Sequence, residues 1–257
     1  MNAILRVARA EVLEHRRQPW MLFILLANYA LFIAVFAVVF LTLDALASTP
    51  SGLAQLRQQT GAAGVELETV VRLASSTFGS LLFTNLPLFV AIMAGTSVLH
   101  DRECGTLPFL MLAPLTRRQL LVGKLVGAMA IPLLLHLALV GAGCVLMGRI
   151  ELLAPHAHKL GASPAWWIAF LVGAPASACF VGALGTVISA LSRDVRTSMQ
   201  FTSFFIGLLS LGIGAVLVDG IDQGPALQLV FAGACLLASA LTLVVGAHLV
   251  SRDLSSA

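Results

Sequence analysis

Metal-binding side chains are scarce in this 257-residue chain, which has six histidines and twelve acidic residues. His156 and His158 stand two positions apart, close to Glu151 and Lys159. Imidazole and carboxylate are zinc ligands, but two histidines with no third partner at a defined spacing make a weak site. We therefore expect this stretch to be a solvated loop and the chain to hold no metal.

A phosphate-binding loop is the second chemistry to consider. It needs Gly-x-x-x-x-Gly-Lys followed by Ser or Thr, because its backbone N–H groups surround the phosphates. The chain has one Gly-Lys pair, Gly123-Lys124, with Arg118 in place of the first glycine and Leu125 in place of the hydroxyl. The sequence thus predicts that this chain does not bind ATP by such a loop.

Intramembrane catalysis is the third chemistry, and it needs a nucleophile or a metal centre at membrane depth. The patterns His-Glu-x-x-His, Gly-x-Ser-Gly and Gly-x-Gly-Asp are all missing from the sequence. We expect no enzymatic activity in this chain, and an intramembrane enzyme is the least favoured alternative.

Polar residues inside apolar stretches are the remaining candidates. His136, Asn28 and Asn85 lie within such stretches. A polar side chain at membrane depth either satisfies its hydrogen bonds inside the helix bundle or lines a pathway. Both interpretations stay open for His136, and the three residues together are weak candidates for a substrate path.

The elements that position these groups are predicted to be membrane helices. The chain is 59% hydrophobic and 11% charged, against roughly 25% charged in an average soluble domain. Apolar stretches of about 20 residues cross a bilayer core. Six occur, at about 20–43, 76–99, 120–147, 165–191, 198–218 and 225–250. The sequence predicts an all-α membrane protein with six transmembrane helices in a single domain over 1–257.

Positive charges are unevenly divided between the two sides of these spans. Eleven of the fifteen lysines and arginines fall in the two tails and the loops on the same side, and four fall on the other. Basic residues favour the cytoplasmic side. We expect both termini to be cytoplasmic, loop 44–75 to be external, and the chain to lie in the bacterial inner membrane, with no nucleic-acid partner.

Residues 1–18 carry apolar residues at helical spacing, with charged residues between them; the apolar set is Ile4, Leu5, Ala8, Val12 and Leu13. This pattern predicts an amphipathic helix on the inner membrane surface. Pro19 then favours a turn into the first span, because a proline at a helix start loses no hydrogen bond. Loop 44–75 is expected to hold one or two short helices.

Loop 100–118 is organised as a short helix between two stops. Gly105 permits a turn, Thr106 can cap the helix, and Pro114 ends it. Thr116 and Gln119 have the spacing of a capping box for the next helix. The short helix is apolar, so either a partner or the membrane surface should cover it, and the residues alone leave both possibilities open.

A family resemblance favours the partner. The pattern Glu103-x-Gly105-Thr106-Leu107-x-x-Leu110, then Pro114-Leu115-x-Arg117, then Leu120-x-x-Gly123-Lys124 resembles the coupling-helix region of type-2 ABC exporter permeases. Pro108 departs from that pattern, where an acidic residue is common. The resemblance implies that Glu103, Gly105, Thr106, Leu107, Leu110, Met111, Pro114 and Arg117 couple the chain to a separate ABC ATPase subunit.

The resemblance also implies the remaining partners. The ATPase would bind ATP and Mg²⁺, this chain would hold no cofactor, and a second permease copy would complete a homodimer in the lipid bilayer. The nearly uncharged spans favour a lipid-like or amphiphilic cargo, and a metal- or haem-linked cargo stays open. A non-transporting membrane assembly or anchor factor coupled to an ATPase is the main alternative.

Overall fold

The computed structural model describes residues 3–16, 19–62, 67–112, 114–149, 164–192, 194–206 and 224–253. Throughout these ranges the regular secondary structure is helical. This confirms the predicted all-α class.

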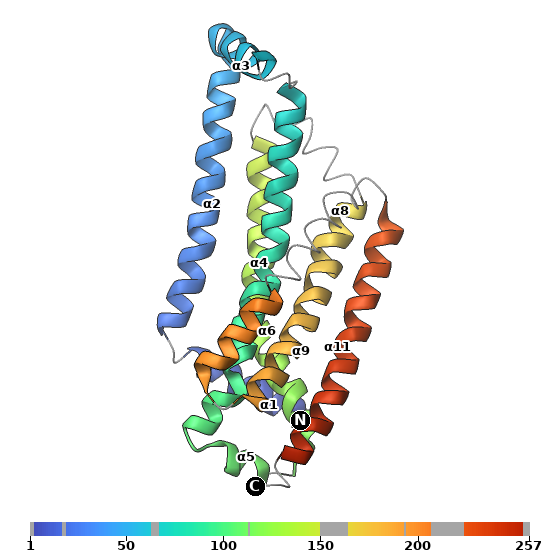
Figure 1. The fold of residues 1–257 in the computed structure, drawn as a ribbon. Coiled ribbons are helices and arrows are strands. Elements are labelled where there is room, and N and C mark those ends of the chain that lie inside the picture. Colours follow the sequence, from blue (N-terminus) through green and yellow to red (C-terminus); the bar gives the residue numbers. More distant parts are fainter. Residues whose placement is uncertain are drawn as a thin grey trace.

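The first half of the described chain contains α1 (Ala3–Arg16), α2 (Pro19–Ala47), α3 (Pro50–Ala62), α4 (Leu67–Glu103) and the short α5 (Leu107–Leu112). The second half contains α6 (Arg117–Arg149), α8 (Pro164–Ile168), a π-helical turn η1 (Ala169–Gly173), α9 (Ala174–Leu191), a helical segment over 195–206, and α11 (Pro225–Asp253). In Figure 1, α3 lies at one end of the molecule, and α1, α5 and the last turns of α11 lie at the other.

Four described helices are long and apolar enough to cross a membrane: Gly79–Glu103, Arg117–Gly143, Pro164–Leu191 and Pro225–Val250. A shorter apolar helix, Phe23–Val39, lies within α2. The chain is therefore a multi-pass membrane protein. Residues 207–218 of the predicted fifth span lie outside the described ranges, so the number of six spans stays a prediction.

Two details of the sequence prediction change. Helix α4 begins at Leu67, so the predicted external loop 44–75 contains one separate short helix, α3, and the first turns of α4. Helix α1 also departs from the predicted pattern at Glu11, a charged residue that is buried. Leu5 and Leu13 are exposed, and the position of α1 on the membrane surface stays a prediction.

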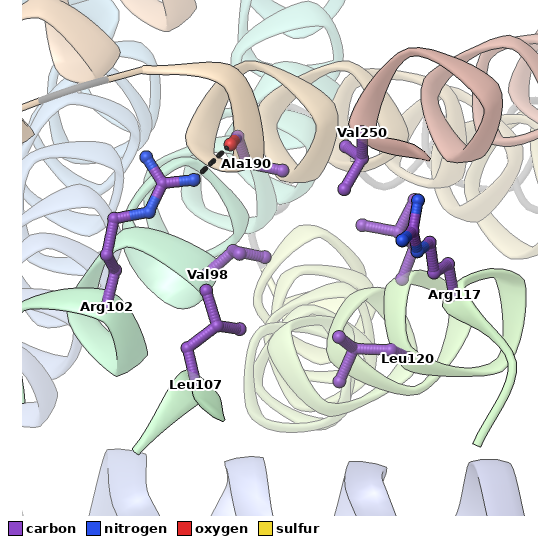
Figure 2. Close-up of a pocket in the computed structure, with 8 residues that line it drawn as sticks. Val98, Arg102, Leu107, Arg117, Leu120, Ala190 and Val250 are labelled. Atoms are coloured by element: carbon purple, nitrogen blue, oxygen red, sulfur yellow. Dashed lines mark hydrogen bonds between the residues drawn. The ribbon is translucent and has the colours of Figure 1, made fainter. Parts of the chain in front are cut away.

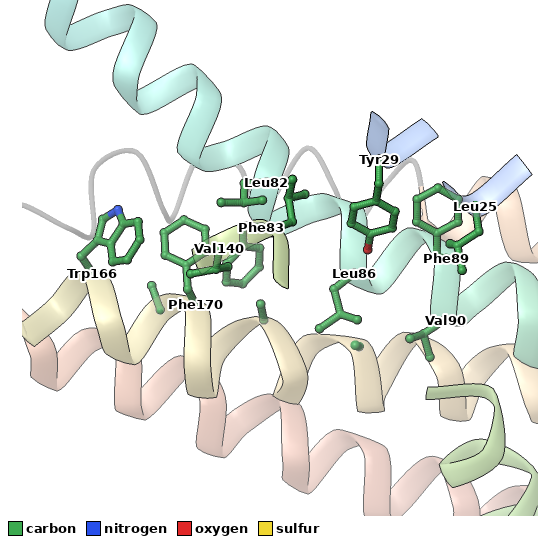
Figure 3. Packing of buried hydrophobic residues seen from close by; sticks show 14 of the residues in the cluster. Leu25, Tyr29, Leu82, Phe83, Leu86, Phe89, Val90, Val140, Trp166 and Phe170 are labelled. Atoms are coloured by element: carbon green, nitrogen blue, oxygen red, sulfur yellow. The ribbon is translucent and has the colours of Figure 1, made fainter. Parts of the chain in front are cut away.

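The core lies where α4 packs against α9. Phe83, Leu86 and Val90 of α4 are fully buried and face Phe170 and the small residues of α9 (Figure 3). A Cβ atom added at Gly185 would lie 3.0 Å from the Ala91 carbonyl oxygen, so this glycine lets the two backbones approach closely. On the other side of α4, Tyr29 of α2 stacks on Phe89 at a ring distance of 5.4 Å.

Candidate functional site

The turn that leads into α5 is held by its own hydrogen bonds. Gly105 has φ = 70°, a left-handed conformation that glycine adopts without strain. The Thr106 backbone N–H and its hydroxyl both donate to the Asp101 carbonyl, and the hydroxyl also lies 3.1 Å from the Asp101 carboxylate. The predicted capping role of Thr106 is therefore wrong in detail, because its hydroxyl turns back toward α4.

The start of α6 has the capping box that the sequence predicts. The Gln119 side chain accepts the Thr116 N–H at 2.9 Å, and the Thr116 hydroxyl accepts the Gln119 N–H at 3.3 Å. These reciprocal bonds satisfy two N–H groups that the first helical turn leaves without partners. They also fix where α6 begins relative to α5.

Helix α5 has two apolar faces. Leu107 is 7% exposed and packs with Val98 and Leu120, which line a small pocket together with Arg117 (Figure 2). Leu110 is half-buried against the same cluster. On the opposite face Phe109 is 73% exposed and Leu112 is 83% exposed.

The outward face of α5 is not formed by the two leucines of this helix that the family pattern selects. Leu107 and Leu110 hold α5 on the bundle, whereas Phe109 and Leu112, which the pattern did not select, offer apolar surface. Glu103 and Pro114 are exposed, and the side chain of Met111 lies outside the described residues. That any of these residues couples to a partner stays a prediction.

Arg102 joins this loop to the end of α9. Its guanidinium donates at 2.9 Å to the carbonyl oxygens of both Ser192 and Ala190 (the latter bond is drawn in Figure 2). The last carbonyls of a helix have no partner within the helix and carry partial negative charge. A cation placed there satisfies them and connects the α4–α5 turn to the loop that follows α9.

A buried ion cluster lies directly behind α5, and the sequence prediction missed it. The Lys124 ammonium of α6 lies 2.6 Å from the Asp101 carboxylate of α4 and forms a second ion pair with Glu11 of α1. It also donates to the Ser97 carbonyl at 3.2 Å. The sequence alone placed Lys124 among the loop charges, because both acidic partners are distant in the chain.

Close packing brings α1 to this cluster. Gly123 and Gly127 lie one turn apart on α6, and a Cβ atom added at Gly127 would lie 2.4 Å from the Glu11 Cβ. The small-residue pair that the sequence shows at this spacing is therefore the surface on which α1 lies. Val7 and Ala8 of α1 are buried in the same contact.

Burial changes the acid–base behaviour of two residues of α1. It raises the pKa of Glu11 to about 7, because the attraction of Lys124 does not offset the loss of water and the nearby charges of Glu14 and Asp101 add to the rise. Burial, helped by the charge of Lys124, lowers the pKa of His15 to about 4. The folded chain retains the Glu11 proton longer than the unfolded chain, so this residue reduces stability as pH rises from about 4.5 toward 7. His15 has the opposite effect, increasing stability from about pH 4 to 6.5.

His136 is fully buried in α6 and lies 3.3 Å from the Phe170 carbonyl oxygen. That carbonyl lies in η1, where the Ala174 N–H donates five residues back to Ala169. The next residue, Pro175, has no N–H to offer Phe170. The His136 Nε2–H can therefore supply the bond that Pro175 cannot, which is the structural role that the sequence left open.

The other two candidate path residues have different surroundings. Asn28 is exposed on α2, and Asn85 is half-buried on α4, where its side-chain nitrogen has no hydrogen-bond partner in the structure. His136, Asn28 and Asn85 thus belong to three different helices, and a shared path between them stays a prediction. His156 and His158 lie outside the described residues. Among the described residues no group of three metal-binding side chains was found.

Several membrane-length helices define a multi-pass membrane protein, and a short apolar helix lies at the end that carries both α1 and the close of α11. The profile of the ABC-2 family of transporter proteins matches residues 5–229, so the chain belongs to that family. A stretch of 145 residues is 34% identical to a protein of Stutzerimonas stutzeri described as a probable ABC transporter permease protein, NosY. The match covers 56% of this chain and 44% of that relative, so the chain matches less than half of the relative's length.

Proposed function

We propose that this chain is the membrane subunit of an ABC exporter, that it has no ATPase activity of its own, and that a separate ATPase subunit docks on α5. The observation that carries the proposal is the outward face of α5, where Phe109 and Leu112 are exposed beyond the ends of the spans. Apolar side chains in this position favour a protein partner, since a buried aromatic or aliphatic anchor is the usual centre of an interface.

The proposed topology puts α5 in the cytoplasm with both termini. The positive charges favour this orientation, and the end that carries α5 also carries α1 and the close of α11 (Figure 1). Six spans in the bacterial inner membrane complete this arrangement. ATP and Mg²⁺ would bind to the ATPase subunit.

The proposed working unit contains two permease chains, because six spans form half of the expected pathway. A closed two-fold pair is the commonest arrangement of identical subunits. The cargo proposed is lipid-like or amphiphilic, since the described spans have little charge away from their cytoplasmic ends. A metal- or haem-linked cargo is the second possibility for the same pathway.

The docking experiment compares two faces of α5. The tagged chain is purified from membranes of its host, and the ATPase subunit that accompanies it is quantified. Leu112→Arg puts a charge on the outward face, and we expect it to lower ATPase recovery by at least tenfold, which corresponds to about 1.4 kcal/mol. Leu107→Ala should instead lower the thermal stability of the permease, because the side chain packs on the bundle.

Ser51→Arg provides the control, because Ser51 is exposed on α3 at the opposite end of the molecule. It should leave ATPase recovery unchanged. Wild-type ATPase recovery and ATP-dependent export by the Leu112→Arg protein would show that α5 is not the docking site. Docking without any cargo-stimulated ATP hydrolysis in the wild type would favour the non-transporting anchor instead.

A further inference from the structure

The buried ion cluster behind α5 is built from three separate helices. Glu11 of α1 is 1% exposed, Lys124 of α6 is 3% exposed, and Asp101 of α4 is 5% exposed. One ammonium therefore serves two carboxylates away from water. Glu14 of α1 adds a third acidic group 4.0 Å from the Lys124 nitrogen.

Holding the helices together does not require these charges. Gly123 and Gly127 already give α1 and α6 a close-packed contact. Removing two carboxylates and an ammonium from water costs several kcal/mol per ion, and apolar side chains of the same size are often equally stable or better in such places. The cluster thus adds something that simple packing of α1 would not supply.

Asp101 gives the cluster a direct connection to α5. One carboxylate oxygen of Asp101 faces Lys124 at 2.6 Å, and the other lies 3.1 Å from the Thr106 hydroxyl. Thr106 immediately precedes α5, and its carbonyl accepts the Leu110 N–H inside that helix. Hydrogen bonds and ion pairs therefore connect α5 with α1 through four side chains: Thr106, Asp101, Lys124 and Glu11.

These contacts can pass a movement of α5 on to Lys124. A shift of α5 moves Thr106 and with it the Asp101 carboxylate, and this changes the position of Lys124 between Asp101 and Glu11. Salt-bridge networks are among the contiguous contacts that can carry coupling between two sites. Such a cluster can link the position of α5 to the position of α1.

We propose that Lys124 is a positioning residue that, through Asp101 and Glu11, transmits displacement of α5 to α1 and α6. This inference rests on the proposed function, because it assumes that an ATPase moves α5. On this proposal α1 moves during the ATPase cycle.

The test separates an effect on transmission of α5 movement from an effect on the stability of the permease. In the complex of the permease with its ATPase subunit, the triple variant Glu11→Gln, Asp101→Asn, Lys124→Met removes all three charges and keeps side chains of similar size. We expect it to retain near wild-type melting temperature and ATPase recovery, because no buried charge is left without a partner. Stimulation of ATP hydrolysis by the assembled permease should fall at least tenfold.

Three further proteins control this result. Lys124→Met alone leaves the two buried acidic residues Glu11 and Asp101 without their cation, and it should melt well below the triple variant. Arg9→Gln removes a charge from the exposed face of α1 and should leave both stability and stimulation unchanged. Thr106→Val interrupts the first link without touching the ion pairs, and it should lower stimulation while ATPase recovery stays normal.

Wild-type stimulation in a stable triple variant would overturn the proposal and leave the cluster a structural role. If the triple variant does not fold, Thr106→Val decides: normal stimulation in that variant overturns the proposal, and reduced stimulation with normal docking supports it. Failure of the wild-type chain to recover or stimulate any ATPase would instead overturn the proposed function itself.

Discussion

Substituting Gly127 by alanine should loosen α1 from the bundle. The new methyl group would lie 2.4 Å from the Glu11 Cβ and 3.0 Å from the Ala8 carbonyl oxygen. Carbon atoms in contact normally lie about 3.5–4.0 Å apart, so α1 must move outward by roughly 1 Å. Forcing an extra methyl group into a close-packed contact costs about 1–3 kcal/mol. The same displacement would lengthen the ion pair between Glu11 and Lys124.

Gly141→Ala is the matched control. Gly141 lies on the same helix, and a Cβ atom there meets nothing within 4 Å. Both substitutions gain about 1 kcal/mol of helix propensity, so this contribution cancels when the two variants are compared. The remaining difference of about 1–3 kcal/mol measures the contact with α1.

The assay is thermal unfolding of the purified permease in detergent, combined with limited proteolysis near the N-terminus. Gly127→Ala should melt several degrees below Gly141→Ala and release α1 to protease at lower temperature. Equal melting temperatures and equal protection of α1 would refute the close packing of α1 on α6.

Three further predictions concern other residues of the same end of the molecule. Between about pH 4.5 and 6.5 the effects of Glu11 and His15 on stability oppose each other. The stability of Glu11→Gln should therefore rise with pH by up to about 3 kcal/mol, and the stability of His15→Gln should fall. Parallel profiles for the two variants would contradict the burial of these two residues. Arg102→Ala should destabilise the junction of α4 with α9 by about 1–3 kcal/mol, because it removes the hydrogen bonds to Ser192 and Ala190. The measurement is amide hydrogen exchange over residues 190–206, which should become faster. Unchanged exchange there would argue against both hydrogen bonds. In intact cells an impermeant thiol reagent should label a cysteine placed at Ser51 but not the exposed native Cys104, and the reverse pattern would invert the proposed topology.

Local features were predictable from the sequence, since their partners are a few residues apart. The capping box of Thr116 and Gln119 spans three positions, and each side chain satisfies the other's backbone. The start of α2 at Pro19 and the short helix before Pro114 follow from the same local chemistry. Turn and cap residues act through their own backbone, so no tertiary information is needed.

The ion cluster was not predictable in this way. Lys124 and Glu11 are 113 positions apart, and a lysine one turn inside a span is equally compatible with a loop charge that reaches the membrane surface. The outward face of α5 was hidden for a different reason. A six-residue apolar helix has no polar face to mark its exposed side, so only the packing of Leu107 shows which way it points.

The contact between α1 and α6 can form only late in biosynthesis. Helix α1 leaves the ribosome first, but the surface on which it packs is made more than a hundred residues later. At about 5–20 residues per second, the 113 positions from Glu11 to Lys124 take roughly 6–23 s. Throughout that interval Glu11 lacks its cation Lys124, so we expect it to stay in contact with water. This end of the molecule is therefore completed late in synthesis, and a chain truncated before α6 would lack the lysine that pairs with Glu11.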